Sequence, residues 1–387
     1  MIDFELTKEQ QVIRKVTRDF VKRELPPEVI KEHERNHKYP AGVIKKMAVL
    51  GLTASTVPRQ YGGAGLDWIS HGLICEEIGG AWFSLSLIVN LVHVGLVQMP
   101  LVWFGNDDQK KKYLPKLVKA EMTGCVCAVE PNVGSDATSV ETAAVLDGDS
   151  WVINGSKTWI TNAGNADIFL VFCQTDKSKG TKGLAFILVE KGTPGLSVKE
   201  IEWKTGIACC PTNEVSFASC RVPKDNLVGQ VGRGFQVTVS GIVNVRYSLS
   251  AACTGIVQSC LDASVKYSQE RRQFGKAIGS FQLVQELIAD MAISAEASRM
   301  LYLHVGYLKD KGLPLERETS IAKIFSTEAA LRASANAMKI HGAYGYCDEF
   351  PVERHFRDIM APTIFGGTNE IHRLFIGRGL TGLDAYR

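Results

Sequence analysis

An apolar segment at residues 85–104 carries two polar side chains, Asn90 and His93, that could take part in catalysis. Histidine is the side chain that most readily accepts a proton near neutral pH. Asn90 lies about one helical turn away and could orient the histidine or a substrate. The alternative for His93 is a core histidine bonded to a backbone carbonyl. His93 is therefore the candidate catalytic base and Asn90 a candidate substrate-binding residue, with Tyr247 and Glu77 as weaker candidates for the base.

Three other places have the residue types of ligand-binding loops. Gly134 and Ser135 form a turn whose backbone N–H groups can donate to phosphate or ring acceptors. Trp159, in a β-rich region, is either a core residue or an aromatic platform. Arg271 could hold a pyrophosphate through a charge-assisted fork, or could end a solvated helix. Each pattern alone has an ordinary structural explanation, so the case for a ligand rests on their combination.

The spacing of apolar residues changes twice along the chain and predicts the elements that position these groups. Residues 1–120 have helical spacing and begin with a capping box at Thr7 and Gln10. Residues 121–230 contain β-rich runs at 168–173, 184–189 and 215–217, with turn chemistry at 147–149 and 154–155. Helical spacing returns from residue 231 to residue 387. The sequence therefore predicts a mainly α protein with a middle β-domain and three domains, 1–120, 121–230 and 231–387.

Composition argues against several classes of protein. The 44 basic and 41 acidic residues give a net charge of +3 without a basic tract, so we expect no nucleic-acid partner. The ten cysteines lack zinc-ligand spacing, which predicts no metal site and a reducing compartment. Residues 85–104 are long enough to span a membrane, but their polar residues favour a buried helix and no membrane insertion. The N-terminus resembles neither a signal peptide nor a transit segment.

Five motifs, in order and at the family's spacing, resemble those of the acyl-CoA dehydrogenase family over essentially the full length. They are residues 128–136, 154–162, 270–282, 341–346 and 357–373. The resemblance implies a helical N-domain, a β-barrel-like middle domain and a C-terminal four-helix bundle. It also implies a homotetramer with FAD at the subunit interfaces. Lys339, Val129 and Ala343 depart from the residues common in the family, which puts individual contacts in doubt but not the cofactor.

The resemblance also implies which residues bind FAD and the acyl-CoA. The FAD residues would be Val126, Val129, Gly134, Ser135, Trp159, Thr161, Arg271, Phe274, Gln282, Lys339, Gly342, Thr368 and Glu370. The substrate-binding residues would be Ser135, Asn90, Arg246, Gly366 and Gly367, with Arg246 near the coenzyme A moiety.

The usual catalytic base of the family is missing from this chain. Most members carry a glutamate at the place of Gly366, and some carry it immediately before the arginine that Arg246 matches, where this chain has Val245. Neither residue can accept a proton. The backbone N–H of Gly366 could still polarise a thioester carbonyl, whereas loss of a positioned base typically costs about 10²- to 10⁴-fold in rate.

We therefore expect an FAD-dependent oxidoreductase that acts on an unusual, cyclic or bulky acyl-CoA thioester through a relocated base. Its electrons would pass to an electron-transferring flavoprotein. The alternatives are an FAD-retaining lyase such as a desulfinase, and a catalytically silent acyl-CoA-binding subunit. A bacterial cytoplasm is the expected location, or an organelle matrix in a eukaryote.

Overall fold

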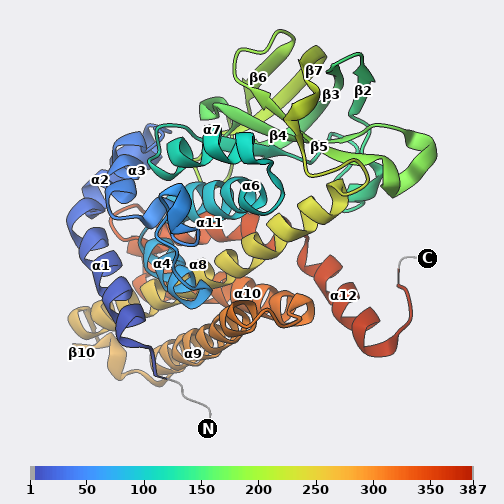
Figure 1. The fold of residues 1–387 in the computed structure, drawn as a ribbon. Helices are drawn as coiled ribbons and strands as arrows, with labels where there is room; N and C mark the ends of the chain where they lie inside the picture. Colours follow the sequence, from blue (N-terminus) through green and yellow to red (C-terminus); the bar gives the residue numbers. More distant parts are fainter. Residues whose placement is uncertain (1–4, 386–387) are drawn as a thin grey trace.

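The computed structural model describes residues 5–385, and its elements follow the order helices, sheet, helices (Figure 1). The first helices are α1 (Lys8–Glu24), α2 (Pro27–Arg35), α3 (Ala41–Val49), α4 (Trp68–Ala81), α5 (Phe83–Ser86), the π-helix η3 (Leu87–Gln98), α6 (Met99–Phe104) and α7 (Asp107–Val118). The strands are β1 (Gly124–Cys127), β2 (Ala143–Asp147), β3 (Ser150–Thr161), β4 (Ile168–Gln174), β5 (Leu184–Glu190), β6 (Leu196–Glu200), β7 (Thr212–Pro223) and β8 (Leu227–Val228). The last part holds α8 (Gly234–Glu270), the hairpin β9 (Arg272–Gln273) and β10 (Lys276–Ala277), α9 (Gln282–Asp310), α10 (Glu316–His341), α11 (Val352–Ile364) and α12 (Asn369–Thr381).

The first helix begins where the sequence predicts it. Thr7 accepts a hydrogen bond from the backbone N–H of Gln10, and the Gln10 side chain accepts one from the N–H of Thr7. This capping box satisfies two N–H groups that the first turn of a helix leaves without partners. A second capping box, formed by Asn106 and Gln109, starts α7.

The strands form one eight-stranded sheet in the order β6-β7-β3-β2-β4-β5-β8, with β1 paired to β4. A tight turn at Gly148 joins β2 to β3, as predicted. The predicted turn at 154–155 is wrong, because both residues lie inside β3, where the pairing with β7 shifts register. A Cβ on Gly155 would lie 2.5 Å from Thr142 Oγ1, so glycine is needed there for a close approach rather than for a turn.

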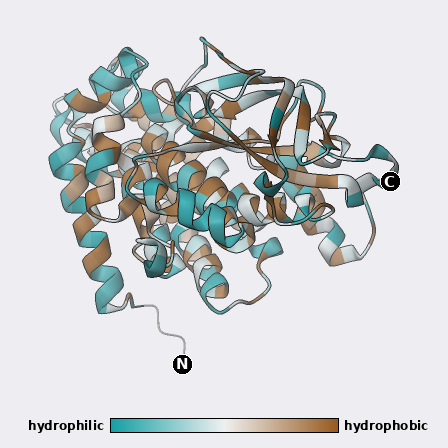
Figure 2. Cartoon of the chain, turned by 45° about the horizontal axis from the view of Figure 1, so that its top comes forward, coloured by the Kyte–Doolittle hydropathy of each residue, from teal (hydrophilic) through white to brown (hydrophobic). Residues whose placement is uncertain are grey.

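The apolar segment that sequence spacing predicts as one buried helix is continuous but irregular. It runs from Phe83 to Phe104 through α5, η3 and α6. Among the described residues it is the one helix long and apolar enough to cross a membrane by composition, yet 89% of its apolar window is buried. Hydrophobic residues likewise concentrate on the inward sides of the surrounding helices (Figure 2). The segment is therefore the central core helix of the N-terminal part.

The C-terminal helices build the predicted bundle. Helices α8, α9 and α10 pack against one another, and α11 lies against α8 and α10. Helix α12 extends away from this bundle toward the end of the described chain (Figure 1). The structure changes from helix to strand between residues 118 and 124 and back between 228 and 234. The domain limits at 120 and 230 stay a prediction.

Candidate active site

Two segments of the sheet domain lie side by side. The family resemblance predicts that both contact the flavin. The backbone N–H of Thr158 donates to the carbonyl of Val129 at 3.0 Å, which joins the segment after β1 to strand β3. Val129 and the Gly134-Ser135 turn are exposed, while Val126 is half-buried on β1. A Cβ on Gly134 would meet nothing within 4 Å, so the turn is open on that side.

Trp159 is held outward by a bulge in β3. Simple alternation along a strand would place residues 157 and 159 on the same face, but the β3–β7 register shifts between Lys157 and Ile160. Trp159 adopts φ +58°, a left-handed conformation that is uncommon for a bulky residue. Its side chain is 59% exposed, whereas Ile160 is buried. The strained bulge thus turns a large aromatic ring from the core to the surface, with Thr161 half-buried beside it.

A buried ion pair links the same two segments beneath the surface. Lys157 Nζ lies 2.7 Å from Glu130 Oε1 and donates to the carbonyl of Phe172 at 2.6 Å. Glu130 also accepts the backbone N–H groups of Glu141 and Thr142 at 2.6 and 2.8 Å. Both side chains are at most 2% exposed. The pair ties strand β3, two residues before the exposed Trp159, to the segment after β1. Sequence reasoning missed this ion pair because the two residues are 27 positions apart.

The remaining predicted flavin residues are not brought to this platform within one chain. Arg271 and Phe274 lie in and beside the β9–β10 hairpin, and Gln282 begins α9. Figure 1 places this hairpin at the end of the molecule away from the sheet. Phe274 is 93% exposed. Lys339 and Gly342, at the end of α10, belong to the same C-terminal region.

The loop between α11 and α12 carries the two glycines of the family signature. Gly366 and Gly367 have φ +70° and +89°, so both occupy conformations that favour glycine. Thr368 caps α12, and Glu370 is exposed in its first turn. A Cβ on Gly366 would lie 3.7 Å from Val245 Cγ1. The two positions at which the resemblance predicts a base therefore face each other, and neither carries a titratable side chain.

Three basic side chains hold this loop by its backbone carbonyls. Arg246 Nε donates to Gly366 O at 2.8 Å, and His372 Nε2 lies 3.2 Å from the same oxygen. Lys323 Nζ donates to Gly367 O at 2.9 Å. Burial lowers the pKa of His372 to about 3, so it is neutral at physiological pH. Sequence reasoning found Arg246 but missed Lys323 and His372, which no local motif relates to the loop.

The π-helix η3 separates the two polar residues of the apolar segment. Gly95, five residues after Asn90, packs against α8, because a Cβ on Gly95 would lie 3.7 Å from the backbone nitrogen of Val245. Asn90 Nδ2 donates to Ser86 Oγ at 3.1 Å within the same apolar segment. Its Oδ1 is buried and has no hydrogen-bond partner among the described residues.

His93, two positions before Gly95, lies on roughly the opposite side of η3 and contacts α7. Its Nε2 is 2.8 Å from the carbonyl of Leu117, and burial lowers its pKa to about 4 although that bond raises it. Because Nε2 must carry the proton donated to the carbonyl, Nδ1 holds a lone pair, and it is buried with no described partner. These contacts favour the core-histidine alternative, and the catalytic role of His93 stays a prediction.

The two weaker base candidates lie in structural networks. The Tyr247 hydroxyl donates to the Trp68 carbonyl at 2.5 Å, and burial raises the pKa of Tyr247 well above its ordinary value. Glu77 accepts from Arg14 and Arg18. Both side chains are thereby engaged in holding helices together.

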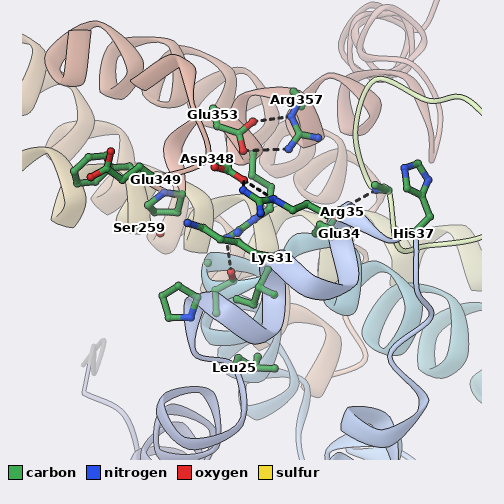
Figure 3. A pocket seen from close by; sticks show the side chains of 18 of the residues that line it. Leu25, Lys31, Glu34, Arg35, His37, Ser259, Asp348, Glu349, Glu353 and Arg357 are labelled. Atoms are coloured by element: carbon green, nitrogen blue, oxygen red, sulfur yellow. Dashed lines mark hydrogen bonds and ion pairs between the residues drawn. The ribbon is translucent and has the colours of Figure 1, made fainter. Parts of the chain in front are cut away.

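A hollow of about 430 Å³ opens between α2, residues 203–208 and residues 348–357 (Figure 3). Its charged walls are largely paired, with Arg35 bound to Asp348 and Arg357 to Glu353. None of the predicted flavin or substrate residues lines it. This hollow is therefore separate from the candidate active site.

Sequence models of the acyl-CoA dehydrogenase N-terminal, middle and C-terminal domains match residues 7–121, 125–220 and 232–381. The chain therefore belongs to the acyl-CoA dehydrogenase family, a class of FAD-dependent oxidoreductases.

Individual relatives are similar over nearly their whole length. An acryloyl-CoA reductase (NADH) of Anaerotignum propionicum is 39% identical over 97% of this chain and 95% of its own. A chain in a solved structure named for the electron transferring flavoprotein of Acidaminococcus fermentans is 38% identical. Its TM-score is 0.93, over 98% of this chain and 100% of that one. The prolyl acyl carrier protein oxidase AnaB is 31% identical, with TM-score 0.93 over 97% of this chain and 100% of AnaB.

The residues on the surface of this chain fit FAD. An exposed indole on a strained bulge suits a ring that stacks on it, and the open Gly134 turn offers backbone N–H groups to a phosphate or ring acceptor. Trp159, Thr161, Gly134 and Ser135 would hold the flavin end. Arg271 and Phe274 lie away from these residues, which fits an FAD site that a second copy of the chain completes. FAD supplies a hydride acceptor when it is bound.

Proposed function

We propose that this flavoenzyme oxidises an acyl-CoA thioester with a bulky or cyclic acyl group, and that the substrate proton leaves to a group outside positions 245 and 366. The proposal rests on Val245 and Gly366, the two positions at which the resemblance predicts a base. A Cβ on Gly366 would lie 3.7 Å from Val245 Cγ1, and neither residue can accept a proton. Val245 lines this space with methyl groups, and Gly366 leaves room for the substrate. The similarity to AnaB, a prolyl acyl carrier protein oxidase, supports a ring-bearing acyl group.

The residues around the loop would bind and orient the thioester. The Gly366 N–H would donate to the thioester carbonyl, where a preorganised donor stabilises developing negative charge. Arg246 would approach the coenzyme A moiety, and Ser135 and Gly367 would complete the contact. Asn90 would meet the acyl group with its buried Oδ1, which has no hydrogen-bond partner among the described residues. Buried apolar residues of η3 and α8, including Val245, belong to one core cluster and would exclude water from the acyl group.

His93→Gln tests whether the relocated base is His93. Because the ring points to α7 and bonds to Leu117, we expect flavin reduction by the best thioester to stay within a few-fold of the native rate. Glutamine can still donate to that carbonyl, so the fold should be kept. Rapid-mixing absorbance measures the rate, with the melting temperature as the folding control. A loss of about 10²-fold or more in a folded, FAD-loaded variant would make His93 the base.

The same proposal covers assembly, electron acceptor and location. The separation of the Trp159 platform from the β9–β10 hairpin supports a homotetramer in which neighbouring chains complete each FAD site. The similarity to a chain in a solved structure that is named for an electron transferring flavoprotein supports such a flavoprotein as the acceptor. We place the protein in the bacterial cytoplasm, in keeping with ten cysteines that lack a disulfide pattern.

Anaerobic mixing of the FAD-loaded protein with linear and cyclic acyl-CoA thioesters tests the function. We expect flavin bleaching and a product lighter by two hydrogens for cyclohexanecarboxyl-CoA, and little bleaching for butyryl-CoA. A product cleaved without lasting flavin reduction would instead indicate a lyase, although residues 81–104 carry no arginine for an anionic leaving group. Spectral perturbation without any chemistry would indicate a silent acyl-CoA-binding subunit.

A further inference from the structure

Lys323 contacts the loop between α11 and α12 and, like His372, is fully buried. The side chain extends from α10 and is 0% exposed. Its Nζ donates to Gly367 O at 2.9 Å, to Asn369 Oδ1 at 2.8 Å and to Thr363 O at 3.4 Å. These acceptors lie at the two ends and the centre of the loop. One ammonium group therefore fixes the whole turn that presents the Gly366 N–H.

The protonation state of Lys323 decides whether this arrangement is complete. An ammonium has three donor hydrogens, which match the three acceptors, whereas a neutral amine has two and no charge. All three acceptors are uncharged oxygens, and no carboxylate among the described residues forms a salt bridge with Lys323. Hydrogen bonds from a charged donor are roughly twice as strong as neutral ones. Loss of the proton would thus weaken the support of the loop.

We propose that Lys323 is a positioning residue whose ammonium holds the Gly366–Gly367 loop in the shape that binds the thioester, so that thioester binding weakens when Lys323 loses its proton. The inference rests on the proposed function, because it assumes that the loop binds an acyl-CoA. It adds a residue that touches neither substrate nor cofactor and acts only through the loop carbonyls.

The groups around Lys323 place its titration within reach of ordinary buffers. Burial, opposed by Cys253 on α8 and assisted by Arg246 on α8, lowers the pKa of Lys323 to about 8. Glu370 on α12 and Glu328 on α10 also raise it, while His372 on α12 is neutral, and α11 contributes the Thr363 carbonyl.

The effect on binding has the opposite sign to the effect on folding. The pKa of Lys323 is lowered from 10.5 to about 8 in the fold. The folded state therefore binds fewer protons than the unfolded chain between those pH values, and the contribution of Lys323 to stability rises with pH there. Thioester binding should fall over the same interval. A purely structural role would not produce this divergence.

The test measures binding of cyclohexanecarboxyl-CoA to the FAD-loaded protein between pH 6.5 and 9.5, by the concentration dependence of the flavin absorbance change in rapid mixing. We expect binding about tenfold weaker above pH 8 than below it. Lys323→Met and Lys323→Gln should bind cyclohexanecarboxyl-CoA weakly at every pH, so the loss of affinity above pH 8 should disappear. Gln retains a donor without titrating, which keeps the test valid if the Met variant does not fold.

Lys309→Met is the matched control. Burial also lowers the pKa of Lys309 to about 8, but this lysine lies 4.1 Å over the Trp68 ring and away from the loop. Lys309→Met should keep the loss of thioester affinity above pH 8. Any effect of titrating coenzyme A itself would also appear in this control. A loss of affinity that persists in both Lys323 variants, or that disappears in Lys309→Met, would overturn the inference. Absence of any flavin perturbation at all pH values would instead contradict the proposed function.

Discussion

Gly366→Glu should give this protein dehydrogenase activity on simple acyl-CoA thioesters, with flavin reduction by butyryl-CoA faster by about 10²- to 10⁴-fold than in the native chain. The nearest atoms to the new Cβ would be Val245 Cγ1 at 3.7 Å and Arg246 Cγ at 4.0 Å, which are ordinary contacts. The left-handed φ of +70° would cost about 1–2 kcal/mol of stability for a residue with a side chain. The carboxylate would then occupy the position at which the resemblance predicts the base.

Two further variants make this prediction specific to a base. Gly366→Gln has the same size and the same backbone strain but cannot accept a proton, so it should stay at the native rate. Val245→Glu presents a carboxylate to the same space from α8, without the left-handed strain, and should also gain activity. Anaerobic rapid mixing measures all three. If neither glutamate variant reacts faster than Gly366→Gln, the α-carbon of the thioester does not lie between these positions.

Lys157→Met should destabilise the fold by about 3–5 kcal/mol and release FAD more readily, because it leaves the Glu130 carboxylate buried without its ion pair. The lost ammonium also bonds the Phe172 carbonyl, and Lys157 lies two residues before Trp159. Loosening it should relax the bulge that presents the indole. Urea unfolding of the apoprotein measures stability, and fluorescence of released flavin measures FAD affinity.

The structure offers two comparisons for this variant. Adding Glu130→Gln removes the stranded charge and should recover part of the stability, since replacing both partners of a buried pair costs less than breaking it. Lys224→Met breaks an exposed pair with Asp149 in the same domain and should change stability by about 0–1 kcal/mol. Equal unfolding midpoints for Lys157→Met and Lys224→Met would show that the buried pair does not anchor the flavin platform.

The sequence by itself determined the class of protein and the order of its elements. Capping residues such as Thr7 and the local spacing of apolar side chains act within a few positions, so helices and strands can be inferred without contacts between distant residues. The five motifs likewise showed the family, which the domain matches confirm. The absence of an acid at 245 and at 366 is also a fact of sequence.

Only the tertiary structure decided how these residues meet. The contact between Val245 on α8 and the loop at Gly366 depends on packing between segments more than 100 residues apart. The direction of His93 depends on the π-helical winding of η3, whereas a sequence pattern assumes the ordinary 3.6-residue period. The outward turn of Trp159 depends on a bulge that strand alternation does not predict. Lys323 resembles an ordinary helical lysine in the sequence, and only folding buries its charge against the carbonyls of the Gly366–Gly367 loop.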